Sequence, residues 1–287
     1  MRGQIIAVTC ALTLATVAGC SSDSKDSGSG SSTTSTTAAK AEDLSILVSN
    51  DDGYSAEGID VLVDALRKLS DVKITVSAPA DQKSGTGSKT VGGTPDQLTA
   101  TDQKTQSGYP VWAVNGFPVD SVNYGLAHMD GKPNLVITGI NEGQNLGPIA
   151  GLSGTVGAAT AGVIAGYPAM AASQGTGEPL DYPSAAALVV DWVKAHRAGL
   201  LDGTAAKVDV NLNVPTCATG KVRGVKQVPL STSASGGLAV TGVPDCTSTA
   251  TEFPGDVEAF LAGFATVTEL NAEKQTVTTS TTWPASG

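Results

Sequence analysis

Short apolar runs alternate with amphipathic segments over most of the chain. Runs typical of buried strands lie at residues 45–49, 73–78, 111–114, 134–138, 168–172 and 208–212. Segments with apolar residues at helical spacing lie between several of them, at residues 56–69, 120–128, 153–165 and 184–198. Strands that alternate with helices predict an α/β fold in which a mostly parallel sheet carries helices on both faces. Residues 87–108 and 225–255 are rich in Gly, Thr, Ser, Pro and Asp, and we expect β-rich excursions or loops there.

The first residues have the pattern of an export signal. Arg2 is followed by an apolar stretch that ends in Val17-Ala18-Gly19-Cys20, which is similar to a bacterial lipobox. The alternative, a membrane-spanning helix, requires about 20 apolar residues, and this stretch is shorter and interrupted by threonines. We therefore expect a lipoprotein signal peptide at 1–19, lipidation of Cys20, a Ser/Thr-rich disordered linker at 20–42 and one folded domain at 43–287. The protein is then exported and anchored to the outer face of a bacterial membrane.

Charge and cysteine content narrow the function further. The chain has a formal net charge of −10, from 17 Lys+Arg and 27 Asp+Glu, and no basic run. This balance argues against binding of long nucleic acid, but a bound cation can still provide positive charge for a small phosphate ester. Cys217 and Cys246 remain after export and are expected to form a disulfide. The alternative, a thiolate metal site, lacks the usual CxxC spacing and a nearby histidine.

Two adjacent carboxylates follow the first predicted strand, in Asn50-Asp51-Asp52-Gly53. Ligands of open parallel sheets collect beyond the carboxyl ends of the strands. Two acids in such a place repel each other unless a cation lies between them, and Mg²⁺ or Mn²⁺ accepts oxygen ligands of this kind. The alternatives are a solvated Asp-Gly turn or helix capping.

Three further segments bring polar groups to the same predicted edge. Ser84 follows the second strand, and Asn141 and Asn145 follow the fourth. Ser153-Gly154-Thr155 opens a predicted helix, whose free backbone N–H groups favour an anion. Together they predict an oxygen-only metal pocket beside an anion site. His128 and His196 lie on helix-like segments away from these motifs and are interpreted as surface or packing residues.

These motifs, in this order, resemble those of the SurE-type survival-protein nucleotidases. The similarity covers about residues 44 to 215 and is carried by Ile46-Leu47-Val48-Ser49-Asn50-Asp51-Asp52-Gly53-Tyr54, Ala78-Pro79 with Ser84-Gly85, Gly116-Phe117-Pro118-Val119-Asp120, Gly139 to Gly147, Ser153-Gly154-Thr155-Val156 and Asn211-Leu212-Asn213-Val214-Pro215.

The resemblance implies a Rossmann-like fold with a C-terminal arm and a metal-dependent phosphomonoesterase acting on nucleoside 5′- and 3′-monophosphates. It implies Asp51, Asp52, Ser84 and Asn141 as metal ligands, with Asp51 and Asp52 also serving catalysis. It assigns Asn145, Ser153, Gly154 and Thr155 to the phosphate. Homodimers or homotetramers formed by exchanged arms are a further expectation.

The chain departs from the family pattern at three positions near the phosphate motif. Ala161 stands where the family usually has an acid, and Ile149 and Leu152 stand where an acid and a Tyr commonly precede Ser-Gly-Thr. Lost carboxylates that orient metal ligands cost about 10 to 100-fold in affinity or rate. A lipid-tethered protein that binds metal and phosphate without turnover is therefore the alternative to an active enzyme. A dinucleotide oxidoreductase is excluded, because no G-x-G-x-x-G follows the first strand.

Overall fold

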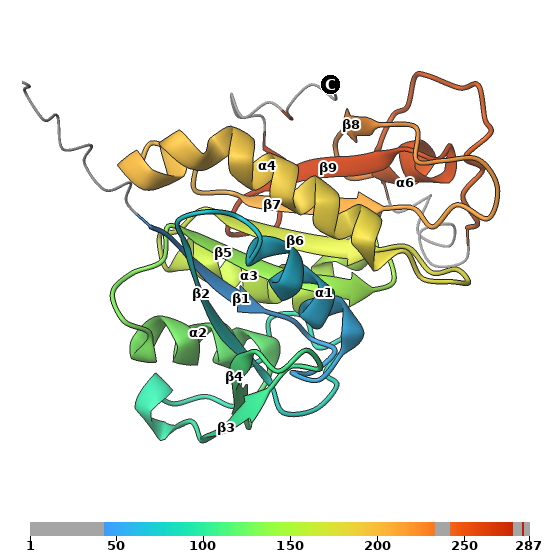
Figure 1. Ribbon diagram of the computed structural model, residues 1–287. Coiled ribbons are helices and arrows are strands. Elements are labelled where there is room, and N and C mark those ends of the chain that lie inside the picture. The colour runs from blue at the N-terminus through green and yellow to red at the C-terminus, as the bar shows by residue number, and fades with distance from the viewer. Residues whose placement is uncertain (1–42, 233–241, 278–282, 284–287) are drawn as a thin grey trace, which may run out of the picture. The chain divides into compact units, whose positions relative to one another are not determined.

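The computed structural model describes residues 43–232, 242–277 and 283 (Figure 1). The expected signal peptide, lipidation site and linker therefore lie outside the described residues. In the described part, nine strands form a single sheet with the order β3-β4-β2-β1-β5-β6-β7-β9-β8. Their bounds are β1 Leu44–Ser49, β2 Val72–Pro79, β3 Ala100–Lys104, β4 Pro110–Val114, β5 Leu135–Glu142, β6 Ala169–Gln174, β7 Asp209–Val214, β8 Val225–Gln227 and β9 Ala265–Leu270.

The centre of the sheet is parallel, and its edges are mixed. β4, β2, β1, β5, β6 and β7 run in the same direction, whereas β3 is antiparallel to β4 and β9 is antiparallel to β7. All six strands predicted from apolar runs are confirmed, within a few residues at their ends. The mostly parallel sheet is confirmed as well.

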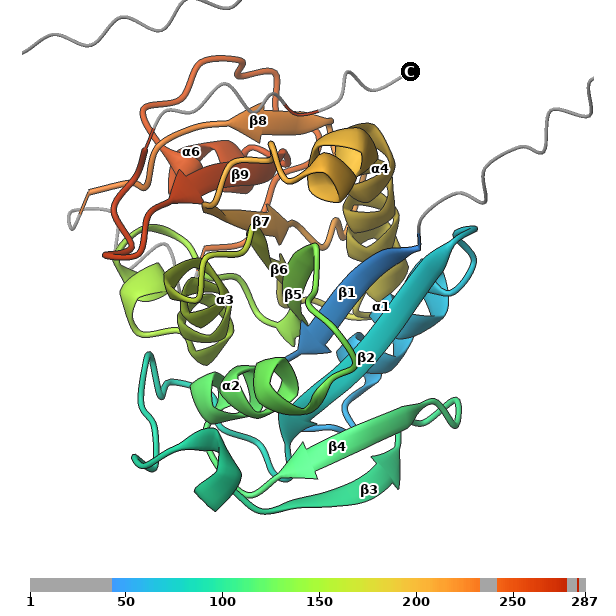
Figure 2. The same ribbon diagram turned by 90° about the vertical axis from the view of Figure 1, so that its left-hand side faces the viewer.

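Helices cover both faces of the sheet, as predicted (Figure 2). α1 (Glu57–Leu66) and α4 (Tyr182–Asp202) pack together on one face, and α2 (Pro118–His128) and α3 (Gly154–Ile164) pack together on the other. The short α6 (Asp256–Leu261) lies beside β9, and the 3-10 turns are η1 (Pro95–Gln97) and η2 (Gly147–Gly151). None of the described helices is long and apolar enough to cross a membrane.

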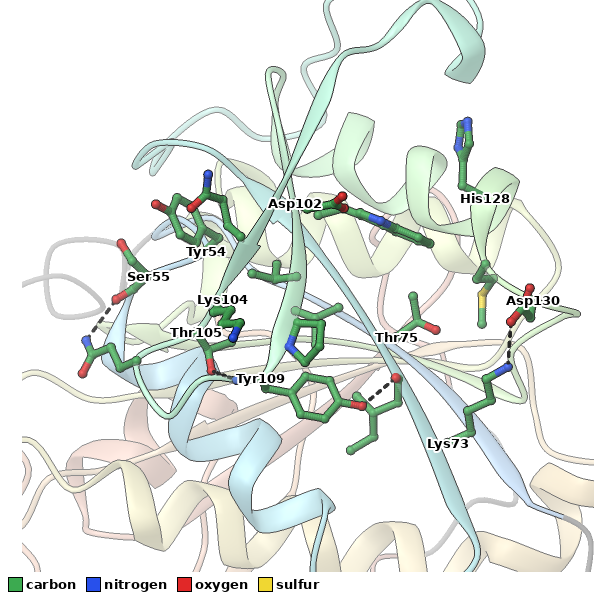
Figure 3. Close-up of a pocket in the computed structure, with 18 residues that line it drawn as sticks. Tyr54, Ser55, Lys73, Thr75, Asp102, Lys104, Thr105, Tyr109, His128 and Asp130 are labelled. Atoms are coloured by element: carbon green, nitrogen blue, oxygen red, sulfur yellow. Dashed lines mark hydrogen bonds and ion pairs between the residues drawn. The ribbon is translucent and has the colours of Figure 1, made fainter.

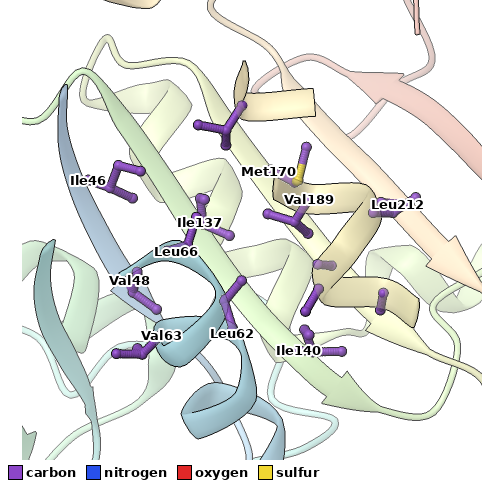
Figure 4. Packing of buried hydrophobic residues seen from close by; sticks show 14 of the residues in the cluster. Ile46, Val48, Leu62, Val63, Leu66, Ile137, Ile140, Met170, Val189 and Leu212 are labelled. Carbon is purple, nitrogen blue, oxygen red and sulfur yellow. The ribbon is translucent and has the colours of Figure 1, made fainter. Parts of the chain in front are cut away.

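The two faces of the sheet are packed with different kinds of side chain. Under α1 and α4, large aliphatic residues such as Ile46, Leu62 and Val189 fill a continuous core (Figure 4). Under α3, the core includes the small residues Ala158 and Ala159, so this helix can approach the sheet closely. This close approach positions the first turn of α3 against the end of β1.

The two irregular stretches differ from each other. Residues 87–108 contain η1 and β3, and β3 forms an antiparallel hairpin with β4. The prediction of a β-rich excursion is therefore confirmed for this stretch. Residues 225–255 contain β8, which pairs with β9, and otherwise have no regular element among the residues described.

A disulfide joins Cys217 to Cys246, whose Cα atoms are 5.8 Å apart and whose sequence separation is 29 residues. Replacing both cysteines with serine is expected to lower the free energy of unfolding by about 3 to 4 kcal/mol, because the unfolded chain regains the freedom of a loop of that length. Denaturant unfolding of the variant and the wild type measures this. Equal stability of the two proteins would contradict the expectation.

A buried carboxylate lies at the opposite end of the sheet from the predicted site. Asp209 begins β7 with no exposed surface, and its Oδ1 accepts a hydrogen bond from the backbone N of Ala171 at 3.0 Å. Its Oδ2 has no hydrogen-bond partner in the described residues. Burial raises the pKa of Asp209 to about 8, although the bond from Ala171 and the charge of Lys274 act in the opposite direction.

This raised pKa predicts how stability changes with pH. The folded state binds the Asp209 proton more tightly than the unfolded state, so stability falls as the pH rises from about 4 towards about 8. Asp209→Asn removes this loss. We expect the variant to gain about 1–3 kcal/mol relative to the wild type between pH 5 and pH 7, in paired denaturant titrations. The exposed Asp130→Asn is the control, and an equal pH response of both variants would refute the prediction.

Candidate active site

Four segments meet at the carboxyl edge of the sheet. β1 lies between β2 and β5, so the loops that follow these three strands start side by side. The N-terminus of α3 lies beside these loops, on the face of the sheet that α2 and α3 cover. These are the segments that carry Asp51 and Asp52, Ser84, Asn141, and Ser153 to Thr155.

Asp51 is locked against the first turn of α3. Its side chain is almost fully buried, and its Oδ1 accepts a hydrogen bond of 2.6 Å from the hydroxyl of Thr155. The hydroxyl of Thr138 on β5 donates in turn to the backbone O of Thr155 at 2.8 Å. Gly154 lies so close that a Cβ atom there would be 2.8 Å from Oδ2 of Asp51. A glycine is therefore needed where the helix begins beside the carboxylate.

Asp52 connects the loops that follow β2 and β5. Its Oδ2 accepts a hydrogen bond from the backbone N of Glu142 at 3.0 Å, and its Oδ1 lies 3.4 Å from Nε2 of Gln82. The same Nε2 donates to the hydroxyl of Ser84, and the backbone N of Ser84 donates to Oε1 of Gln82 at 2.8 Å. Gln82 thus holds Ser84 next to Asp52.

The surroundings of the two carboxylates disfavour their charged forms. Burial raises the pKa of Asp51, and burial together with the neighbouring charge of Asp51 raises the pKa of Asp52 to about 7. None of the ion pairs among the described residues involves either carboxylate. The site is therefore strongly electronegative and has no cationic side chain to balance it.

Asn141 and Asn145 are placed differently. Asn141 is the second-last residue of β5, and its Nδ2 donates to the backbone O of Gly143. The side chain of Asn145 donates instead to the hydroxyl of Ser173 at 3.0 Å, and its backbone N donates to Oδ1 of Asn213 at 2.6 Å. Asn211 donates to the backbone O of Asn145 at 3.0 Å. These bonds fix the loop after β5 to β6 and β7.

The hydrogen bonds show which of the predicted site residues lie together. Asp51 and Thr155 are directly bonded, Gly154 is in contact with them, and Asp52 reaches Ser84 through Gln82. The hydroxyl of Ser153 caps α3 by accepting from the backbone N of Val156 at 3.2 Å, and its predicted contact with phosphate stays a prediction. Asn145 is bonded to the β6 and β7 strands, and its predicted contact with phosphate stays a prediction.

Sequence reasoning gave no specific role to Gln82 or to the Asn pair on β7. Asn211 and Asn213 are nearly fully buried in β7, where polar residues alternate with Val210, Leu212 and Val214. Polar residues at every second position of a buried strand are unusual, and that spacing was the available signal for a hydrogen-bonding role.

Hydrophobic packing explains two of the three departures from the family pattern, and nothing in the structure explains Leu152. Ala161 is buried in the cluster beneath α3, and Ile149 packs with Leu146 and Phe260. Leu152 is 63% exposed beside the first turn of α3. An acid at position 149 or 161 would be unfavourable in these apolar surroundings.

In the described residues, no group of three or more His, Cys, Asp or Glu side chains could hold a metal ion. The site combines two carboxylates with a hydroxyl and an amide, which is an oxygen-only set of the kind that hard divalent cations accept. His128 and His196 stack on Tyr124 and Trp192 in their own helices, so neither belongs to the site.

Comparison with known proteins identifies relatives of this chain. The family model described as Survival protein SurE matches residues 46–236. The 5′-nucleotidase SurE of Gloeobacter violaceus is 36% identical over 184 residues, which are 64% of this chain and 68% of the relative. The 5′-nucleotidase SurE of a Synechococcus strain is 38% identical over 175 residues, 61% of this chain and 64% of the relative. The chain thus spans about two thirds of the length of these relatives.

A solved structure extends the similarity to the fold. The crystal structure of the SurE protein from Aquifex aeolicus matches with a TM-score of 0.62 and 28% identity, over 79% of this chain and 93% of the other. The resemblance drawn from the motifs is therefore confirmed. The chain belongs to the SurE survival protein family.

Proposed function

We propose that the protein is a metal-dependent phosphomonoesterase that hydrolyses nucleoside 5′- and 3′-monophosphates to nucleoside and phosphate. One observation carries the proposal: the buried Asp51 lies against the N-terminus of α3 beside the half-buried Asp52, and neither carboxylate forms an ion pair among the described residues. A cation-binding pair beside an anion-binding helix end suits a phosphate ester bound between them. The names of the relatives support the nucleotide substrate.

The residues of the site fit a divalent cation, Mg²⁺ or Mn²⁺. Asp51, Asp52, Ser84 and Asn141 would hold it, because all four offer oxygen atoms. Burial raises the pKa of Asp51, and burial with the charge of Asp51 raises the pKa of Asp52, so a cation would stabilise both carboxylates. When bound, the ion supplies positive charge for the phosphoryl oxygens and lowers the pKa of a bound water.

The chain's own groups supply positioning and proton transfer. Backbone N–H groups of the first turn of α3, from Gly154 and Thr155, hold the phosphoryl oxygens and the charge that develops on them. Asp51 is held in place by the hydroxyl of Thr155, so it serves as an oriented ligand for the cation. Asp52 is less buried, and its Oδ1 has only the long contact with Gln82, so this atom accepts a proton from the attacking water as the water oxygen bonds to phosphorus. The bond from phosphorus to the nucleoside oxygen breaks, and that oxygen takes up a proton from solvent.

Phosphate release tests this activity. The purified chain is incubated with 5′-AMP, 3′-AMP and an aryl phosphate, each with Mg²⁺, with Mn²⁺ or with a chelator. We expect release that requires the metal and stops with chelator. A folded protein that releases no phosphate under any of these conditions would overturn the proposal and favour the alternative, a protein that binds metal and phosphate without turnover.

The location of this activity is proposed from the sequence of the N-terminal segment. Cleavage before Cys20 and lipidation of its thiol would anchor the domain to the outer face of a bacterial membrane, where it would release nucleosides from nucleotides outside the cell. Labelling with radioactive palmitate that is lost in Cys20→Ala tests the anchor. A homodimer or homotetramer is proposed as well, and light scattering of the purified chain tests it.

A further inference from the structure

A cleft of about 920 Å³ opens between β2 and β4 (Figure 3). The two strands pair only where Ser77 to Pro79 meet Trp112 to Val114, and they diverge over their preceding residues. The cleft occupies the resulting V-shaped gap and is separate from the carboxylates of the active site.

Side chains brace this gap open. The hydroxyl of Tyr109 reaches across it and donates to the backbone O of Ile74 at 2.8 Å. Nε2 of Gln106 donates to the backbone O of Ser55 at 2.9 Å, which ties the β3–β4 hairpin to the loop after β1. The hydroxyl of Tyr109 is already hydrogen-bonded to the backbone O of Ile74. An added peptide strand could pair with β2 at Ile74 only by displacing the Tyr109 side chain. These hydrogen bonds across the gap favour a compact ligand over an extended peptide.

The lining of the cleft combines aromatic and apolar side chains with many polar ones. Tyr54 and Tyr109 line it on the side of α1, and Trp112 lines it on the side of α2. Thr75 and Thr105 add hydroxyl groups. Rings beside a few hydrogen-bonding groups are the usual surroundings of a flat heteroaromatic ligand.

Charges in the lining balance one another. Lys73 pairs with Asp130 at 3.4 Å, and Lys104 lines the same cleft as Asp102. His128 lies 3.8 Å from Asp96. No unbalanced group of cations is present in the lining to hold a phosphate, so the balance favours a neutral ligand.

We propose that this cleft binds a neutral, flat, hydrogen-bonding aromatic compound of nucleoside size. The volume lies within the range of about 300–1,000 Å³ that is common for small-molecule sites. The identification of nucleosides as natural members of this class rests on the proposed function, which would release them as products.

The cleft is joined to the active site by one loop. Tyr54 lines the cleft and follows Asp51-Asp52-Gly53 directly, and its backbone N donates to the backbone O of Pro79 at 2.9 Å. A ligand that packs against Tyr54 therefore contacts the segment that carries both carboxylates. Binding in the cleft is expected to change the apparent KM or kcat of the active site.

Calorimetric titration of the full chain with adenosine tests the proposal, in the wild type and in Thr75→Phe, which places a ring inside the cleft. Gln103→Trp is a second blocking variant, at an exposed lining position where a fold defect is less of a concern. Thr101→Phe is the matched control, because Thr101 is an exposed β3 residue outside the lining. Circular dichroism and phosphate release verify that each variant is folded.

We expect adenosine to bind the wild type and Thr101→Phe equally, and to bind both blocking variants at least tenfold more weakly. Binding that is absent, or that is unchanged in the folded blocking variants, would overturn the inference even if the chain releases phosphate from AMP. Adenosine binding that the blocking variants lose would support it even if the chain releases no phosphate. Failure of the cleft proposal and failure of the proposed phosphatase activity therefore give different results.

Discussion

Asp52→Ala is expected to lower metal-dependent phosphate release by about 1,000-fold or more, the largest effect of any single change in the chain. Asp52 is the carboxylate that contacts both neighbouring segments, the end of β5 through Glu142 and the loop after β2 through Gln82. Its loss removes a cation ligand and the proposed proton acceptor together. Initial rates with 5′-AMP over a series of Mn²⁺ concentrations measure the effect.

Stability separates a catalytic effect from a folding defect in this variant. Asp52 lies in a like-charged, largely desolvated pair, so its removal is not expected to lower the melting temperature. Asp81→Ala is the matched control, since Asp81 is an exposed acid in the loop after β2 with only a 3.9 Å contact to Lys83. Equal rate losses in Asp52→Ala and Asp81→Ala would contradict the assignment.

The sequence predicted those parts of the structure that depend on local patterns. β1 and β5 are short, mostly apolar runs, and burial on both faces of the sheet dictates that pattern, so both strands were predicted correctly. Adjacent Asp51 and Asp52 after β1 suit a cation, a solvated turn or a helix cap, and the other motifs favoured the cation. The motifs then predicted the family.

Features that depend on contacts distant in sequence were not predictable. The amide of Asn145 binds Ser173, 28 residues away, and nothing in the local pattern distinguishes this from a contact with phosphate. The divergence of β2 from β4 is likewise a property of two strands together. A run of apolar residues predicts each strand but not the register between them.

Gly58 illustrates how one backbone contact couples the fold to the site. It lies in the first turn of α1, and a Cβ atom there would be 1.9 Å from the backbone O of Ile140. Ile140 directly precedes Asn141, and α1 follows the loop that carries Asp52. Only a glycine allows this helix to touch β5 at that point.

Gly58→Ala is therefore expected to lower the free energy of unfolding by about 2–4 kcal/mol, because a backbone carbonyl cannot move aside as a flexible side chain can. Gly199→Ala in α4 is the matched control, since its nearest atom would be 3.4 Å away and alanine favours a helix by about 1 kcal/mol. Opposite signs of the two stability changes in denaturant unfolding are the expected result. If Gly58→Ala were as stable as the wild type, the close contact of α1 with β5 would be wrong, and the site geometry built on it would be wrong too.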